Sequence, residues 1–132
     1  MRMWLLATLA LFAVYFPIAT WLKASYVDPT PKGRVVVMLP RPFERFGAAG
    51  AISRVTLDGE DTNEVSRQSQ VLLYEDGKLL GPAHNVHSEI AELGHGRYSH
   101  WEGVGIIFSA SDNSDPNTNS RYYWAVIPEP TP

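Results

Sequence analysis

The stretch MWLLATLALFAVYFPIATWL, residues 3–22, decides the architecture of this chain because it holds 20 consecutive residues without a charge. A helix rises about 1.5 Å per residue, so this stretch would span roughly 30 Å, the hydrocarbon thickness of a bilayer. Trp4 and Trp21 lie near its two ends, where indole rings favour the headgroup level. We therefore predict a transmembrane anchor helix over residues 1–23, with Pro17 kinking the helix or marking its last turn.

A cleaved secretory signal is the alternative for this segment. Such a signal has a short apolar core followed by small residues at a cleavage site. The apolar stretch here is longer than that, and its end, PIATW at residues 17–21, has no A-x-A pattern. Its length therefore favours a retained anchor.

The charges beside the anchor bear on its orientation. Arg2 and the α-amine precede it, and Lys23, Lys32 and Arg34 come after it, so that charge counting leans slightly toward a cytoplasmic C-terminal domain. A two-residue tail before an apolar helix is, however, typical of a signal anchor, which exports the domain on its C-terminal side. We expect a single-pass protein of the cell inner membrane with its C-terminal domain in the periplasm.

The composition of the rest of the chain excludes several classes of protein. Residues 24–132 carry 9 Lys and Arg against 14 Asp and Glu, a net charge of −5. This balance argues against nucleic acid, or an anionic lipid surface, as the main partner, because both require clustered basic residues. The chain has no cysteine, which excludes a disulfide framework and a thiolate nucleophile.

The segment after the anchor is rich in helix breakers. Residues 24–33 include DPTPKG, which predicts a stiff spacer that lifts a domain off the membrane. We expect a β-domain over residues 34–127 and a flexible tail over residues 128–132.

Short apolar runs bounded by turn residues predict a mainly β fold for this domain. The runs lie at residues 34–39, 52–57, 71–74, 79–80, 104–109 and 121–127. Asp76-Gly77 between two of them accepts the positive φ angles of a type I′ hairpin turn. Residues 85–93 form the one expected helix, with Val86, Ile90 and Leu93 facing the sheet. We predict a small antiparallel β-sandwich or partial barrel with one short helix.

From about residue 64 to residue 123 the chain resembles a bacterial accessory β-module. The matching residues are SR at 66–67, YEDG at 74–77, LGPAH at 80–84, His87, Ile90, Gly94, GRYSHW at 96–101, FS at 108–109, SDNSDP at 111–116, TN at 118–119 and Arg121. Ser120 and Tyr122 depart from the pattern, where Gly and Arg are expected. Similar segments are appended to glycosyltransferases and methyltransferases of polysaccharide pathways, so the resemblance implies a compact accessory module rather than a catalytic domain.

Two groups of side chains are candidates for metal binding. His84 and His87 could direct two imidazoles to one zinc ion, although the alternative is that the histidines form hydrogen bonds within the fold. Asp115, Asn117 and Asn119, with Asp112 before them, resemble the start of a calcium loop. The twelfth position is not a glutamate, which excludes an EF-hand and leaves an irregular calcium site or a loop rigidified by its own side chains.

Aromatic and polar side chains near the C-terminal strands are candidates for contact with a ligand or a partner. These candidates are Tyr98, His100, Trp101, Arg121 and Tyr123. Sugars stack on aromatic rings, which makes a glycan one ligand to consider. Adjacent residues of a strand point to opposite faces, so part of this group is expected to lie in the core, Trp101 included.

No catalytic motif accompanies these features, and we expect a protein that is not an enzyme. The combination favours a non-catalytic accessory subunit of a larger bacterial membrane protein complex, for which a respiratory or photosynthetic assembly is a natural host. Its expected partners are integral membrane subunits and the lipid bilayer, with no nucleic acid and no cofactor other than calcium. The alternatives are a membrane-tethered carbohydrate-binding module and a metal-dependent hydrolase.

Overall fold

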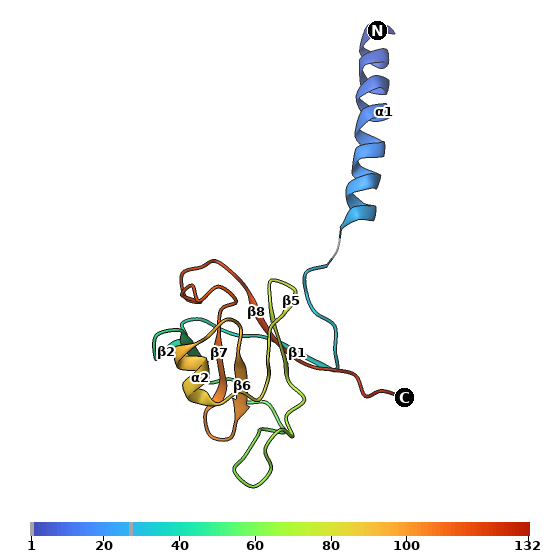
Figure 1. The fold of residues 1–132 in the computed structure, drawn as a ribbon. Coiled ribbons are helices and arrows are strands. Elements are labelled where there is room, and N and C mark those ends of the chain that lie inside the picture. Colours follow the sequence, from blue (N-terminus) through green and yellow to red (C-terminus); the bar gives the residue numbers. More distant parts are fainter. Residues whose placement is uncertain (1, 27) are drawn as a thin grey trace.

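A computed structural model describes residues 2–26 and 28–132 as a long N-terminal helix followed by a β-domain (Figure 1). Helix α1 (Arg2–Ser25) has 24 residues, which gives it a length of about 36 Å. It is long and apolar enough to cross a membrane by length and composition, and none of its described side chains is buried. The predicted N-terminal apolar helix is therefore confirmed, and it extends beyond the expected end at residue 23.

Pro17 lies inside α1 and does not end it. A proline within a helix removes one backbone donor, and nearby hydroxyl groups commonly adjust the local hydrogen bonding. The hydroxyl of Thr20 donates to the carbonyl oxygens of Phe16, at 3.0 Å, and Pro17, at 2.9 Å. Thr8 donates in the same way to Trp4, at 2.8 Å. The hydroxyl groups of both threonines therefore find hydrogen-bond acceptors within the helix and do not require water.

The domain contains two four-stranded antiparallel sheets. The first sheet has the order β1 (Val35–Met38), β8 (Tyr123–Ile127), β4 (Leu72–Glu75) and β5 (Lys78–Leu79). The second sheet has the order β2 (Glu44–Phe46), β3 (Gly50–Ser53), β7 (Gly105–Ser109) and β6 (Tyr98–Trp101). The predicted antiparallel β architecture with one short helix is thus confirmed.

One hydrophobic cluster draws side chains from both sheets. Because alternate residues of a strand share a face, Tyr123 and Ala125 of β8 point to the same side and meet Leu73 of β4 there. Phe108 of β7 belongs to the same cluster, and its ring centroid lies 4.9 Å from that of Tyr123. The ring of Phe43 packs edge-on against both, at 5.1 Å and 6.0 Å.

The observed strands match most of the predicted runs. The hairpin prediction is confirmed, because Asp76 and Gly77 between β4 and β5 have φ angles of 47° and 81°. Strands β2 and β6 lie outside the predicted runs. Strand β2 has only three residues, two of them exposed, so its sequence carries no alternation that predicts a strand.

Helix α2 (His87–Glu92) is shorter than predicted. Of the three residues expected to pack on a sheet, Ile90 is buried, where it clusters with Ile52 and Ile107 of the second sheet. The prediction is wrong for Val86 and Leu93, whose side chains are 63% and 50% exposed. Val86 is an extended residue before the first turn, and Leu93 is the C-cap of this six-residue helix, where its side chain is open to solvent.

The spacer lies along the first sheet. The N–H of Arg34 donates to the carbonyl of Ile127 at 2.9 Å. A Cβ added to Gly33 would meet Val126 at 2.5 Å, and one added to Gly77 would lie 3.4 Å from the carbonyl oxygen of Pro29. The chain therefore packs on β8 before β1 begins.

Candidate functional site

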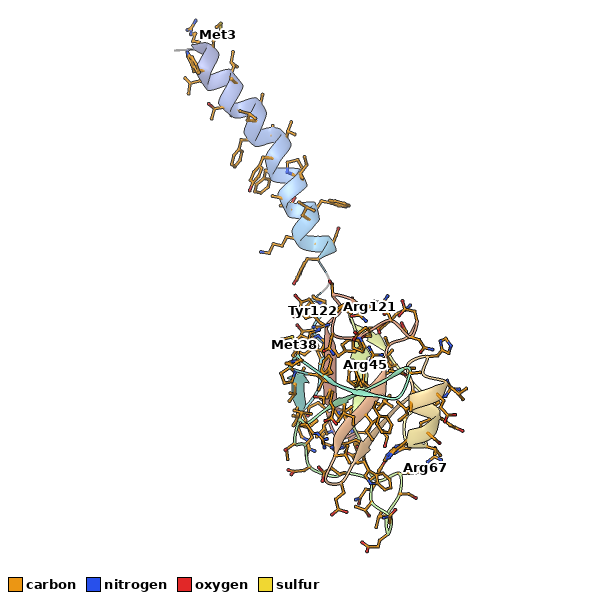
Figure 2. All side chains as sticks on the ribbon, turned by 90° about the vertical axis from the view of Figure 1, so that its left-hand side faces the viewer. Met3, Met38, Arg45, Arg67, Arg121 and Tyr122 are labelled. Atoms are coloured by element: carbon orange, nitrogen blue, oxygen red, sulfur yellow. The ribbon has the colours of Figure 1, made fainter. Side chains whose placement is uncertain are left out.

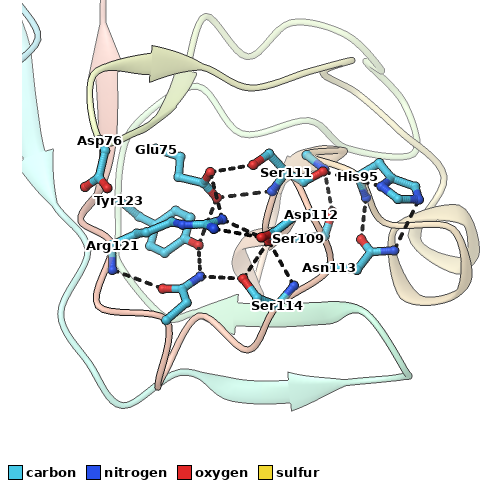
Figure 3. Close-up of polar contacts among 12 residues, drawn as sticks. Glu75, Asp76, His95, Ser109, Ser111, Asp112, Asn113, Ser114, Arg121 and Tyr123 are labelled. Carbon is cyan, nitrogen blue, oxygen red and sulfur yellow. Dashed lines mark hydrogen bonds and ion pairs between the residues drawn. The ribbon is translucent and has the colours of Figure 1, made fainter.

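A network of polar side chains joins the end of β4 to the loop of residues 110–121 (Figure 3). Its centre is the carboxylate of Glu75, which is buried in the domain. Ser111 donates to it through its N–H at 3.1 Å and its hydroxyl at 2.5 Å. The hydroxyl of Tyr123 donates at 3.0 Å, and the guanidinium of Arg121 lies 3.2 Å away. Buried charge is costly unless it is paired and hydrogen-bonded, and these contacts meet that requirement.

Asp112 occupies the outer side of this network. Both of its oxygens accept hydrogen bonds from Arg121, at 2.8 and 2.7 Å, and one oxygen also accepts from Ser114. The Arg121 guanidinium and the Ser114 donors hold the pKa of Asp112 well below its usual range. The hydrogen bonds with Asp112 in turn raise the pKa of Arg121. Asp112 is therefore an ionised carboxylate that is already bound by a cation of the protein.

The loop also contains the remaining calcium candidates. Asn117 accepts the N–H of Phe43 at 2.7 Å and donates to its carbonyl at 3.0 Å. Asn119 donates to the hydroxyl of Tyr123 at 2.7 Å, and Asp115 accepts the N–H of Asn117 at 2.9 Å. These bonds tie the loop to the strands and to itself, which is the alternative that the sequence left open beside calcium.

The buried hydroxyl of Tyr123 reflects the same environment. Burial raises the pKa of Tyr123, and the neighbouring Glu75 carboxylate adds to the effect. The hydroxyl thus stays protonated and remains a donor to Glu75. The network therefore has a structural role: it holds the loop of residues 110–121 against β4 and β8.

A second buried network involves two of the four histidines. The carboxylate of Asp61 is buried, accepts the N–H of Ser69 at 2.7 Å and lies 2.5 Å from Nδ1 of His84. The hydroxyl of Ser69 shares a 2.7 Å hydrogen bond with Nδ1 of His100, and also accepts the N–H of Val71. Because Ser69 and His100 are both buried, the pair attaches the loop of residues 58–70 to β6 rather than forming an exposed nucleophile.

Nε2 of His100 has no hydrogen-bond partner among the described residues. Burial lowers the pKa of His100, although the nearby Glu60 and Asp61 carboxylates oppose the shift. The imidazole is therefore neutral near pH 7, and it is a buried base that acid would have to charge.

The structure brings the two zinc candidates to one surface hollow of about 330 Å³. This hollow is lined by His84, Asn85, Val86, His87, Ser88 and Trp101. His87 packs edge-on against Trp101, with centroids 5.1 Å apart, and burial lowers its pKa. Among the described residues, no group of three or more His, Cys, Asp or Glu side chains could hold a metal ion.

The five contact candidates occupy different environments. Tyr98, His100 and Tyr123 are buried, so a ligand or partner does not reach them in this conformation, and their role here is in the interior. Arg121 is bound by Glu75 and Asp112. Trp101 is partly exposed at the hollow, whereas the sequence favoured a core position. Of the five, Trp101 is the one whose aromatic ring is partly exposed and lines a surface hollow.

The outer face of the first sheet was not singled out from the sequence. The available signal was that the runs around β1, β4 and β8 are apolar at both odd and even positions, so that a second face must also carry apolar side chains.

Comparisons with protein families, with curated proteins and with solved structures found no match to this chain.

Proposed function

We propose that this protein is a non-catalytic, membrane-anchored accessory subunit of a larger complex in the bacterial inner membrane. Helix α1 would cross the bilayer, and the two sheets would form a small sandwich on the periplasmic side. There the domain would contact neighbouring subunits, with a respiratory or photosynthetic assembly as the natural host.

The observation that carries this proposal is the exposure of α1. Its large apolar side chains project outward along its whole length, and no part of the described domain covers them (Figure 2). Exposing that much apolar surface to water is strongly unfavourable, at about 25 cal/mol for each Å². A lipid environment or other membrane helices would remove this cost, which supports an anchor.

The composition of α1 also suits packing against another helix. Alanines recur at every third position, at Ala7, Ala10 and Ala13, and small side chains let membrane helices approach closely. Phe12 and Phe16 stack on one another with centroids 5.7 Å apart. Alanines on neighbouring turns, with the stacked aromatic rings on another side of the helix, fit a subunit that binds a partner within the membrane.

The polar networks of the domain support a non-catalytic role. Glu75, Asp112 and Asp61 are the carboxylates at their centres, and each is bound by side chains or backbone of the domain itself. The resemblance to an accessory β-module implies the same role.

Crosslinking and pull-down of the full-length protein from native membranes test this proposal. We expect the wild-type chain to be recovered with discrete membrane subunits and to migrate as a large species on native gels. Ala10→Leu should weaken this association, because the larger side chain would keep a partner helix from approaching closely. Phe12→Leu is the matched control, since it introduces the same leucine at an aromatic position of α1. Migration of the wild-type protein as a free monomer would exclude the subunit role.

A membrane-tethered carbohydrate-binding module is the second candidate function, favoured by the hollow beside Trp101. The side chains of His84, Asn85 and His87 line this hollow beside the indole ring. A sugar stacked on the indole could form hydrogen bonds with these polar side chains. Calorimetric titration of the full-length protein with glycans, compared with Trp101→Ala, tests this function, and flat traces for the wild-type protein would exclude it.

A further inference from the structure

The outer face of the first sheet carries a continuous row of apolar side chains. Met38 of β1 pairs with Trp124 of β8, Trp124 pairs with Tyr74 of β4, and Tyr74 pairs with Leu79 of β5. Directly paired residues point to the same face of a sheet. Leu73, next to Tyr74, lies in the core, so this row faces away from it.

The two ends of the row are exposed, and its two central residues, Tyr74 and Trp124, are half-buried, Tyr74 beside the spacer. Met38 and Leu79 are 47% and 57% exposed, and Tyr122, two residues before Trp124, is equally open at 57%. Met38, Tyr122 and Trp124 also line a hollow of about 300 Å³ together with Pro29 and Asp76. We call Met38, Tyr74, Leu79, Tyr122 and Trp124 the outer-face patch. Large exposed apolar patches of this kind mark sites of interaction with proteins or membranes.

The chain itself limits how far this patch can lie from the end of α1. Pro29, which lines the hollow, is only four residues after Ser25, the last residue of the helix. Four residues reach at most about 14 Å when fully extended. Figure 2 shows Met38 and Tyr122 at the end of the domain near α1, and Arg67 at the far end. A bilayer around α1 would therefore come close to the patch whatever the domain's tilt.

The dimensions of the bilayer place the end of α1 in the headgroup layer. Helix α1 is about 36 Å long and the hydrocarbon core about 30 Å thick, so its ends would enter headgroup layers of roughly 5–8 Å on each side. The patch contains the residue types that favour this layer, namely Trp and Tyr with apolar neighbours. Tyr26, the residue directly after α1, is exposed as well.

The charges around the patch suit a headgroup layer without demanding anionic lipid. Asp28, Lys32 and Asp76 line the adjoining hollow with Tyr74, and Lys78 precedes Leu79 in β5. The carboxylate of Asp76 already accepts the N–H of Tyr122 at 2.8 Å. This balance fits zwitterionic headgroups, because no basic cluster is present at these positions to recruit phosphate charge.

We propose that the outer-face patch rests on the headgroup layer of the same bilayer that α1 crosses, and that the domain therefore lies against the membrane on its first sheet. This inference depends on the proposed membrane anchor. It leaves the second sheet and the loop of residues 58–70 turned away from the lipid, where a neighbouring subunit could reach them.

Single cysteines in the full-length protein test the proposal, because the chain has no cysteine of its own. Leu79→Cys places a bimane fluorophore in the patch. Val65→Cys, at a similarly exposed apolar side chain near the far end, is the matched control, with exposures of 57% and 51% for the two native residues. Phe12→Cys reports on α1 itself. The labelled proteins are reconstituted in phosphatidylcholine vesicles that carry a nitroxide either on the headgroup or deep in the acyl chain.

We expect the headgroup nitroxide to quench the label at position 79 severalfold more than the label at position 65, and the deep nitroxide to quench position 12. Equal quenching at positions 79 and 65, with position 12 quenched, would overturn the patch proposal and leave the anchor intact. No quenching at position 12 would overturn the anchor and the patch proposal together. A discrete protein adduct from a photo-crosslinker at position 79 in native membranes would assign the patch to a protein and likewise overturn the lipid contact.

Discussion

The hydroxyl of Tyr123 donates a 3.0 Å hydrogen bond to the carboxylate of Glu75, its direct partner across the β4–β8 pair. Removing the charge with Glu75→Gln should cost about 2–4 kcal/mol, because several charge-assisted bonds weaken at once. Tyr123→Phe should cost less, about 1–2 kcal/mol, since it removes one hydroxyl. Urea unfolding of the full-length protein in mild detergent measures both.

Glu102→Gln is the control for this pair of variants. Glu102 is exposed, and its substitution should change the free energy of unfolding by less than about 0.5 kcal/mol. A loss at Glu75 no larger than that at Glu102 would contradict the structural role of the network.

The second prediction concerns pH. The pKa of the buried His100 lies below its ordinary value of 6.5, so the unfolded chain binds a proton more readily than the folded one. The stabilisation from neutral His100 is complete above pH 6.5 and is lost as pH falls through the folded-state pKa, with a limiting slope of about 1.4 kcal/mol per pH unit.

His100→Asn should flatten this dependence, because an asparagine can keep a hydrogen bond to Ser69 and does not titrate. The pKa of His87 is lowered in the same direction, so His87→Asn is measured alongside. Thermal unfolding between pH 7.5 and pH 5 provides the comparison, over a window chosen around the ordinary histidine pKa of about 6.5. If the variant that combines His100→Asn and His87→Asn kept the wild-type dependence of stability on pH, other groups would govern acid stability.

The third prediction concerns Asn117, whose side chain bonds both the N–H and the carbonyl of Phe43. Asn117→Ala should cost about 1–3 kcal/mol, because each bond contributes roughly 0.5–1.5 kcal/mol. Asn63→Ala, at an exposed loop position, is the control and should have little effect. Equal stability of the two variants would mean that the loop of residues 110–121 is not held by this contact.

The fourth prediction compares two glycines with positive φ. Gly94→Ala would drive a Cβ into Oδ1 of Asn113, whereas Gly59→Ala meets nothing within 4 Å. Both variants carry the backbone penalty of about 1–2 kcal/mol, and only Gly94→Ala adds an overpacking cost of about 1–3 kcal/mol. Denaturant midpoints of the two variants measure the difference, and equal midpoints would contradict the close packing at Gly94.

The fifth prediction tests the orientation that we propose for α1. In intact spheroplasts, a membrane-impermeant maleimide should label Val65→Cys in the domain and should not label Met3→Cys until the cells are lysed. This pattern is expected for an exported domain, because a membrane-impermeant reagent added to intact spheroplasts reaches only the periplasmic face of the inner membrane. The reverse pattern would place the domain in the cytoplasm.

The sequence predicts the fold well where a pattern is local. The N-terminal apolar helix and the Asp76-Gly77 hairpin depend on neighbouring residues, and both are confirmed. Tyr98, His100 and Trp101 are predicted as contact residues, but no strand is predicted at β6. Its sequence, YSHW, mixes polar and aromatic side chains that are nearly all buried, so it shows no alternation between apolar and polar positions. The pairing with β7 that makes it a strand is a tertiary contact.

The candidate site was harder to predict because its contacts are distant in sequence. Glu75 meets Ser111 and Arg121, which are 36 and 46 residues away. The loop of residues 110–121 looked like a source of metal ligands because its oxygens are visible in the sequence, whereas the arginine and backbone groups that bind those oxygens are identified only once the sheets are assembled.

The pairing of Val35 with Ile127 has a practical consequence for fusion proteins. The chain enters the domain and leaves it on adjacent strands, so the five residues after Ile127 can carry a fused protein at most about 18 Å from that point. Cargo attached at the C-terminus would lie beside the loop of residues 58–70, because Val35 and Ile127 line one hollow with Asp58, Gly59, Gln68 and Gln70. A tag inserted in that loop would therefore compete with C-terminal cargo for the same side of the domain.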